Sequence, residues 1–335
     1  MLLGNIEFEG FVLNASGARG FFGETYPLPH PGFLADWKGS IFVTKTVTWS
    51  PRLGNMPLRE DGVTPEERFP RSIIVKPWGG HVLNCVNLSN AGAEALYAMG
   101  HWHKLDQLVL SFMAVGERKQ QRIGEWIQFL RFISTVRSTL PAKFAIEINI
   151  ACPNTGHNMA DLLAEVKTML KIGCAQLAVP FIVCINLLVE PETAFEISQL
   201  PGCAAVSQSN SIPWGEYPDD IPWKKIFGTD ESPLVARGFK AGGYSGPYAL
   251  PILLRWLGKL RYVRGACATR WLIAGGGIQS VDDALTVCRV ADPMLRAIKL
   301  GVVGLLRPGR VQPIIREVNR YMGYADKTKI RKEKP

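Results

Sequence analysis

Residues 144–154 read FAIEINIACPN, and this stretch decides the fold that the rest of the sequence is expected to adopt. Residues 144–150 alternate and are rich in β-branched and aromatic side chains, which is typical of a buried strand. Pro153 cannot continue strand pairing, so Cys152 is expected on a rigid turn at the carboxyl end of that strand. Asn149 and Asn154 flank the thiol with amides that both donate and accept hydrogen bonds. A thiol between two amides packs poorly in a core but suits chemistry.

The composition indicates a globular protein. With 335 residues, of which 47% are hydrophobic, the chain can bury a large core. No apolar run reaches the roughly 18 residues that span a bilayer, and the first residues lack the basic and apolar regions of a secretion signal. The seven cysteines are odd in number and form no C-x-x-C pair, so neither a disulfide framework nor a metal site is expected. The cytoplasm is the expected location, without membrane contact.

Nearly half of the net charge of +9 lies near the end of the chain. Residues 327–334 contain five basic residues and one acidic residue, so residues 324–335 are expected to form a flexible, solvated basic tail. The charge is therefore not taken as a sign of nucleic-acid binding. A positive field would still attract an anionic substrate.

Strand-like and helix-like segments alternate along the chain. Eight strands are expected at 11–15, 41–45, 108–114, 144–150, 181–187, 203–209, 271–275 and 295–301. Helices are expected at 91–101, 116–139, 159–172, 191–200, 247–260, 281–290 and 308–321. Eight such units favour a single-domain (β/α)8 barrel over residues 1–323 rather than an open doubly wound sheet. The long irregular stretches 50–90 and 210–243 are expected to be lids or binding loops.

Polar residues follow five of the predicted strands, where a barrel places its chemistry. They are Asn14 to Gly17, Thr44 to Thr46, Asn149 with Cys152 and Asn154, Ser209 to Ser211, and Ala274 to Gly277. Asparagine after a strand is often only a turn former. Five strand ends that converge on one pocket by geometry favour a binding site instead.

Two glycine-rich turns precede helices late in the chain, at Gly242 to Pro247 and at Gly275 to Ile278. Glycine lets backbone N–H groups approach a phosphate, and the helix N-terminus adds a favourable dipole. The loops after strands seven and eight are the usual phosphate site of a barrel, so a cofactor phosphate is expected here. Lys45 closes an apolar strand and needs an anionic partner, unless its amine reaches solvent at the rim.

Together these residues resemble the dihydroorotate dehydrogenase family, which are FMN-dependent (β/α)8 barrels of pyrimidine synthesis. The similarity extends over nearly the whole chain. It rests on Asn14 to Gly17, Thr44 to Thr46, the Gly54–Arg59 loop, Asn84, the set Asn149, Cys152 and Asn154, the pair Asn210 and Ser211, and both glycine turns.

The resemblance implies a role for each of these residues. Cys152 would be the catalytic base that removes the C5 proton of dihydroorotate while a hydride passes from C6 to N5 of FMN. Substrate contacts are implied for Lys45, Asn84, Asn149, Asn154, Asn210 and Ser211. FMN contacts are implied for Ala15, Ser16, Gly17, Lys45, Thr46, Asn149, Cys184, Gly243, Ser245, Gly246, Gly275, Gly276, Gly277 and Gly301. A cysteine base, and a chain that begins directly at the barrel, are typical of the soluble class.

Three positions depart from the family pattern. Cys184 stands where the family has a lysine beside flavin N1, Asn87 stands where it has glycine, and Lys299, after an insertion from Asp292, replaces a glutamine. The loss of the lysine predicts a lower flavin potential. Two alternatives remain open, an FMN-dependent reductase of another dihydropyrimidine and a flavin-binding barrel that has lost activity. The sequence also leaves open a homodimer, an electron-transfer partner subunit, and the acceptor (fumarate, NAD or a quinone-like dye).

Overall fold

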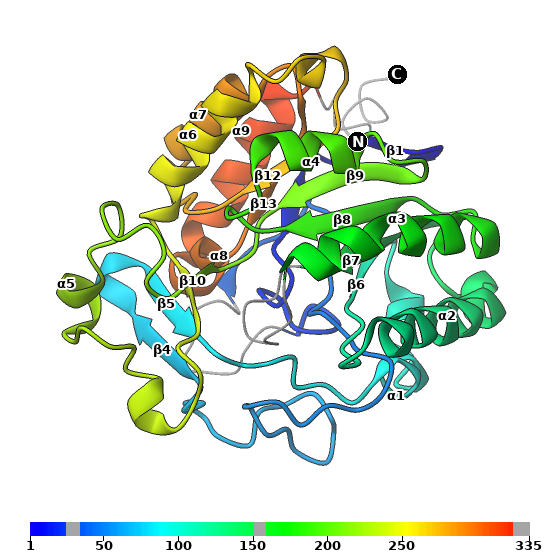
Figure 1. Ribbon diagram of the computed structural model, residues 1–335, viewed down its shortest axis with the longest axis horizontal. Helices are drawn as coiled ribbons and strands as arrows, with labels where there is room; N and C mark the ends of the chain where they lie inside the picture. The colour runs from blue at the N-terminus through cyan, green and yellow to red at the C-terminus, as the bar shows by residue number, and fades with distance from the viewer. Residues whose placement is uncertain (25–33, 151–158, 324–335) are drawn as a thin grey trace, which may run out of the picture.

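The computed structural model describes residues 1–24, 34–150 and 159–323, and its centre is a curled sheet of seven parallel strands (Figure 1). The strands run in the order β3-β13-β12-β9-β8-β7-β6. Their bounds are β3 Val12–Asn14, β6 Gln107–Phe112, β7 Lys143–Asn149, β8 Phe181–Ile185, β9 Cys203–Gln208, β12 Leu272–Gly275 and β13 Leu295–Leu300.

Residues 41–47 close the sheet into a barrel between β3 and β6. They form no continuous strand, but Ile41 bridges Leu13 and Val43 bridges Val109, both in parallel register. The Val43 backbone also pairs with a side chain: its N–H donates to Asn14 Oδ1 at 2.9 Å, and its carbonyl accepts from Asn14 Nδ2 at 2.6 Å. The side-chain amide of Asn14 therefore replaces the backbone of a neighbouring strand as the partner of Val43, at the junction between β3 and residues 41–47.

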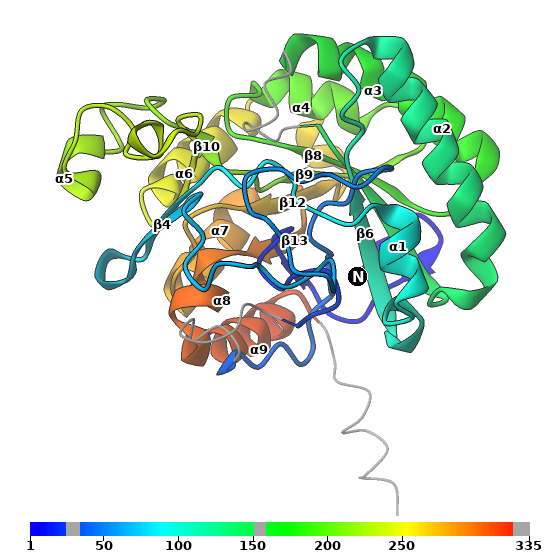
Figure 2. The ribbon, with the colours of Figure 1, turned by 90° about the horizontal axis from the view of Figure 1, so that it is seen from below.

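Helices cover the outside of the barrel, and most of them connect consecutive strands (Figure 2). Figure 2 shows α2, α3 and α4 on one side and α6, α7, α8 and α9 on the other. The bounds are α1 Ala93–Ala98, α2 Lys119–Val136, α3 Met159–Gln176, α4 Pro191–Ser198, α5 Trp223–Phe227, α6 Ala249–Leu260, α7 Val281–Ala291, α8 Val302–Leu306 and α9 Val311–Tyr321. None of the helices in the described ranges is long and apolar enough to cross a membrane.

The barrel interior has an apolar lower layer, to which all seven strands and residues 41–47 contribute. One buried cluster contains Leu13, Ile41, Val43, Val109, Ala145, Ile182, Ala205, Ile273 and Ala297. The hairpin of β1 (Leu2–Leu3) and β2 (Ile6–Glu7) adds Met1, Leu3 and Phe8 to this cluster from below. Because side chains alternate along a strand, the next inward positions lie one layer higher. They are Ala15, Lys45, Ser111, Glu147, Cys184, Ser207, Gly275 and Lys299, and this layer is mostly polar.

A second sheet lies at the carboxyl ends of the barrel strands, beyond the arrowheads of β8 and β9 in Figure 1. It is antiparallel, in the order β10-β11-β5-β4. Its strands are β4 Ile73–Lys76, β5 His81–Asn84, β10 Ile212–Pro213 and β11 Gly243–Ser245. The prediction that 50–90 and 210–243 are irregular is thus wrong in part, since strands from both stretches pair here. Their partners are about 160 residues apart in sequence, which local patterns cannot show.

The predicted (β/α)8 barrel and its single domain are confirmed. Seven of the eight strands lie where the sequence pattern placed them, while 41–45 contributes only isolated bridges. The predicted boundary at residue 323 stays a prediction, because residues 324–335 lie outside the described part of the chain.

Asn14→Ala should lower the free energy of unfolding by about 2–4 kcal/mol, because a buried N–H and a buried carbonyl of Val43 lose their partner. Urea unfolding measures this loss. Asn5→Ala, at an exposed asparagine, is the control and should change stability little. Equal stability of the two variants would show that the junction between β3 and residues 41–47 does not need the Asn14 amide.

Candidate active site

A cavity of about 410 Å3 opens at the carboxyl ends of the barrel strands. Its floor comes from the strand ends, and its walls come from the β4–β5 hairpin and from α8. A smaller cavity of about 70 Å3 adjoins it under the two glycine turns. The two cavities share Ala15, Ser209, Asn210, Ser245, Gly301 and Val302, so they form one continuous space.

Most residues singled out in the sequence line this space. The large cavity is lined by Ala15, Ser16, Gly17, Lys45, Thr46, Asn84, Asn149, Cys184, Asn210, Ser211, Ser245 and Gly301. The small cavity adds Gly246, Gly275, Gly276 and Gly277. Gly243 lines neither cavity; its carbonyl accepts a hydrogen bond from Asn84 Nδ2 at 3.4 Å. Cys152 and Asn154 lie outside the described residues, so their predicted roles stay predictions.

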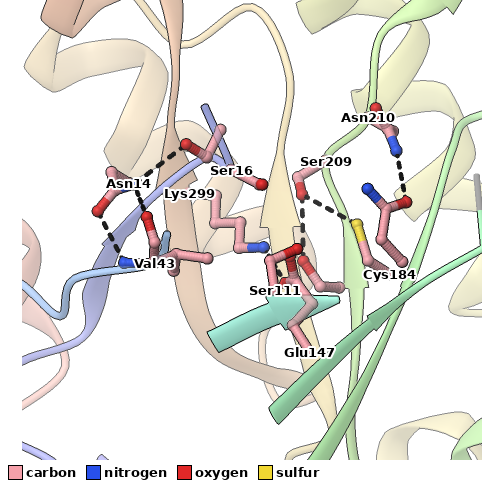
Figure 3. A network of polar contacts seen from close by, with 12 residues as sticks. Asn14, Ser16, Val43, Ser111, Glu147, Cys184, Ser209, Asn210 and Lys299 are labelled. Carbon is pink, nitrogen blue, oxygen red and sulfur yellow. Dashed lines mark hydrogen bonds and ion pairs between the residues drawn. The ribbon is translucent and has the colours of Figure 1, made fainter. Parts of the chain in front are cut away.

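A network of hydrogen bonds joins the ends of several strands across the floor, and Figure 3 shows the part of it around Cys184, Ser209 and Asn210. The Thr46 hydroxyl lies 2.8 Å from Ser16 Oγ and 3.0 Å from Ser111 Oγ, and it accepts from Asn149 Nδ2 at 3.0 Å. Asn210 Nδ2 in turn donates to Asn149 Oδ1 at 3.1 Å. These bonds hold the Asn149 amide in one orientation at the cavity floor.

A second group of polar contacts ties the barrel to the small sheet. Asn210 Oδ1 accepts from the Ser211 backbone N–H at 3.1 Å. Ser211 Oγ lies 3.2 Å from Ser245 Oγ and accepts from Asn84 Nδ2 at 3.5 Å. Three asparagines from β5, from β7 and from the loop after β9 therefore border the same cavity.

Lys45 is the buried cation of the cavity wall, which also includes Arg59 and Arg68. Its ammonium donates to the Ser89 carbonyl at 2.8 Å and lies 4.8 Å from the centre of the Phe21 ring. Only 7% of the residue is exposed. Burial lowers the pKa of Lys45 to about 7, and the nearby Glu24 carboxylate opposes this shift only in part. In the described ranges no carboxylate forms an ion pair with this ammonium. An anionic ligand would supply the partner that the sequence analysis expected.

Cys184 lies at the end of β8 in the same floor. Its sulfur is 3.8 Å from Ser209 Oγ, which is 3.1 Å from Ser207 Oγ. Burial raises the pKa of this thiol to about 12, and Glu147 adds to the shift while Lys299 opposes it. Cys184 is therefore a neutral thiol at physiological pH, and β8 brings no positive charge to the cavity floor.

The small cavity is lined by the loops that follow β12 and β13, where a barrel usually binds phosphate. It lies at the N-terminus of α6, between the turn that contains Gly246 and the turn at Gly276 and Gly277. Gly277 has φ +72°, and a Cβ there would lie 2.3 Å from the Leu250 nitrogen, so only glycine fits. Ser245 adds a hydroxyl to the lining. These residues fit the phosphate of a cofactor such as FMN.

The structure also reveals site features that the sequence analysis missed. An apolar wall is formed by Ile73, Val75, Val82, Leu305 and Leu306. It joins a hairpin to a helix more than 200 residues away, so no local signal predicts it. The second missed feature is a buried ion pair of Glu147 with Lys299. A glutamate within an otherwise apolar strand was the signal that could have drawn attention to it.

No three His, Cys, Asp or Glu side chains of the described chain gather where they could hold a metal ion.

Comparison with known proteins places the chain in a family. Residues 2–296 match the family described as Dihydroorotate dehydrogenase. The catalytic subunit of dihydroorotate dehydrogenase B (NAD(+)) from Desulforudis audaxviator is 27% identical over 317 residues, covering 93% of this chain and 88% of that subunit. The subunit of the same name from Carboxydothermus hydrogenoformans is 24% identical over 332 residues, covering 96% and 91%.

A solved structure shows the same fold. The dihydroorotate dehydrogenase of Eimeria tenella, in complex with ferulenol, superposes with a TM-score of 0.63 at 14% identity, and the match covers 97% of this chain and 85% of that one. The fold is a (β/α)8 barrel, and the family match makes the chain an oxidoreductase. The chain belongs to the dihydroorotate dehydrogenase family, the flavin-dependent oxidoreductases of pyrimidine biosynthesis.

Lys45→Met should stabilise the protein below pH 7 and lose this advantage as pH rises from about 7 towards 10.5, the ordinary lysine pKa. The folded state has the lowered pKa, so the unfolded state binds more protons in this window and wild-type stability rises with pH. Urea unfolding of both proteins between pH 6 and pH 10 measures the difference. Lys104→Met, at an exposed lysine, should show no such trend. A pH-independent difference for Lys45→Met would contradict the lowered pKa.

Proposed function

We propose that the protein oxidises dihydroorotate to orotate with FMN as its cofactor. The observation that carries this proposal is the convergence of Asn84, Asn149 and Asn210 on one cavity that continues into the glycine-lined space. The substrate is a small heterocycle with several ring N–H and C=O groups and one carboxylate. Amide side chains complement such a ring because each can donate and accept.

The polar residues of the cavity would bind and orient the substrate. The three amides are preorganised: Asn149 is held between Thr46 and Asn210, and Asn84 is held by Ser211 and Gly243. Preorganised partners reduce the entropy that is lost when the substrate is fixed for reaction. Lys45 would interact with the carboxylate or with the adjacent flavin oxygens, and this anion would favour its charged form.

Cys152 would act as the base. The chain reaches it three residues after Asn149, which ends β7 at the cavity floor. The thiolate would take the proton from C5 of dihydroorotate while a hydride leaves C6, which yields orotate and a neutral thiol. FMN, when bound, supplies the hydride acceptor. A thiol of ordinary pKa needs an environment that favours the thiolate to serve as a base at neutral pH.

The electrons are proposed to pass to NAD through a partner subunit. This proposal is supported by the relatives, which are named catalytic subunits of dihydroorotate dehydrogenase B (NAD(+)). Fumarate and quinone-like dyes are the other acceptors to be tested. A homodimer and a cytoplasmic location remain predictions.

The proposal is tested by the absorbance of the purified protein. It should bind FMN, and addition of dihydroorotate without oxygen should bleach the flavin bands. Cys152→Ala should keep FMN but slow the bleaching about 10²–10⁴-fold, the usual contribution of a general base. Cys152→Ser should retain slow activity at higher pH.

Three outcomes would contradict parts of the proposal. A protein that takes up no FMN contradicts the cofactor. FMN that bleaches only with other dihydropyrimidines, or with none, favours the alternative reductase or the inactive barrel. An unchanged rate in Cys152→Ala removes the cysteine from the reaction.

Asn84→Ala and Asn210→Ala should each weaken orotate binding by roughly 1–3 kcal/mol, because a buried ligand group is left unpaired. Asn186→Ala is the matched control: Asn186 is buried, but it accepts a turn hydrogen bond from Leu188 and lines neither cavity. It should lower the melting temperature and leave orotate affinity unchanged. If the cavity variants behave like this control, the asparagines are turn formers.

A further inference from the structure

The strongest unexplained feature of the barrel is the ion pair between Glu147 of β7 and Lys299 of β13. Both side chains are fully buried. They point toward each other across the interior in Figure 3, in the polar layer directly above the apolar cluster. The nearest neighbours in this layer include Cys184, whose thiol responds to both charges: Glu147 raises its pKa and Lys299 lowers it.

Of the two residues, only Lys299 borders the ligand space. Lys299 lines the small cavity beside Gly275 and Gly301, whereas Glu147 lines neither cavity. Gly275 is the register partner of Lys299 on β12, and a Cβ there would lie 2.8 Å from Lys299 Cβ, so glycine leaves room for the lysine side chain in this layer. Three other members of the same layer, Ala15, Lys45 and Cys184, line the large cavity, so a charge in this layer lies at the floor of that cavity, where little water screens it.

Packing alone does not explain this pair. One carboxylate oxygen of Glu147, Oε1, has no hydrogen-bond partner among the described residues. Burying two charges with an imperfectly satisfied carboxylate costs stability that apolar residues of similar size would avoid. The layer immediately below is filled by such apolar residues. A role for the lysine charge in the site accounts for the pair better.

We propose that Lys299, oriented by Glu147, is the buried cation that stabilises the reduced, anionic form of the bound flavin from below the cavity. The inference rests on the proposed FMN function. The reduced cofactor holds two more electrons and carries a negative charge, and a fixed positive charge near it favours reduction. Lys299 is thus an electrostatic residue that reaches the site from β13, while β8 presents only the neutral thiol of Cys184.

The test measures the reduction potential of FMN-loaded protein by spectroelectrochemistry. The main variant is Glu147→Gln/Lys299→Gln, which removes both charges and leaves two amides that can pair. Its potential should fall enough to shift the equilibrium between oxidised and reduced flavin at least tenfold, which is about 30 mV for two electrons. Lys299→Met alone should shift it in the same direction and gives a second reading if the double variant folds poorly.

The control is a buried ion pair elsewhere in the molecule. Arg122 of α2 and Glu165 of α3 pair at 2.6 Å with side chains only 7% and 3% exposed, and neither lines the two cavities. Arg122→Gln/Glu165→Gln should lower the melting temperature and leave the potential unchanged. This control separates loss of stability from loss of the local field.

The outcomes distinguish the inference from the function on which it rests. A lowered potential in the Lys299 variants, with FMN still bound and the control unchanged, supports it. Equal potentials in wild type and both Lys299 variants overturn it and leave the proposed function intact. A wild-type protein that binds no FMN overturns both.

Discussion

The closed barrel is the constraint on which the rest of the structure depends. Closure requires residues 41–47 to bridge β3 and β6, and the Asn14 amide supplies backbone partners where the strand pairing is interrupted. Once the barrel is closed, side-chain alternation assigns each inward residue to a layer. The lower layer is apolar and stabilises the fold, and the layer above carries the groups that face the ligand. The carboxyl ends of most strands, though not of β6, then border the two adjoining cavities.

The upper layer combines features that cost stability with features that serve a site. Lys45 is buried without a carboxylate partner in the described ranges, and burial lowers its pKa to about 7. Glu147 and Lys299 hold two opposite charges in the barrel interior. Charged groups in such surroundings act strongly on a bound ligand, because little water screens them. Proteins often retain such costs at functional sites, where strain and unpaired charge contribute to chemistry.

Local sequence patterns predicted most of the barrel strands and the polar residues that follow five of them for a simple reason. A parallel strand buried on both faces leaves a nearly continuous apolar run, and in this chain a group of polar residues follows five of these runs. Asn149 and Ser211 were therefore recognisable as neighbours of strand ends. Residues 41–45 were predicted as an ordinary strand because their apolar pattern is that of a strand. Only their hydrogen bonding differs, since they form isolated bridges in place of a continuous ladder. The Glu147–Lys299 pair was missed because its members are 152 residues apart.

The amino-acid sequence by itself determined the barrel class, the order of its strands and helices, and the identity of the polar residues that follow the strands, since all of these depend on periodicity over a few residues. Tertiary structure alone decided which of those residues share a cavity. It paired β5 with β11 in the small sheet at the opening of the cavity. It also formed the apolar wall of the cavity from the β4–β5 hairpin and α8. It also set Lys299 against Glu147 across the barrel. These contacts depend on the closure of the whole chain, so no local segment contains the information that predicts them.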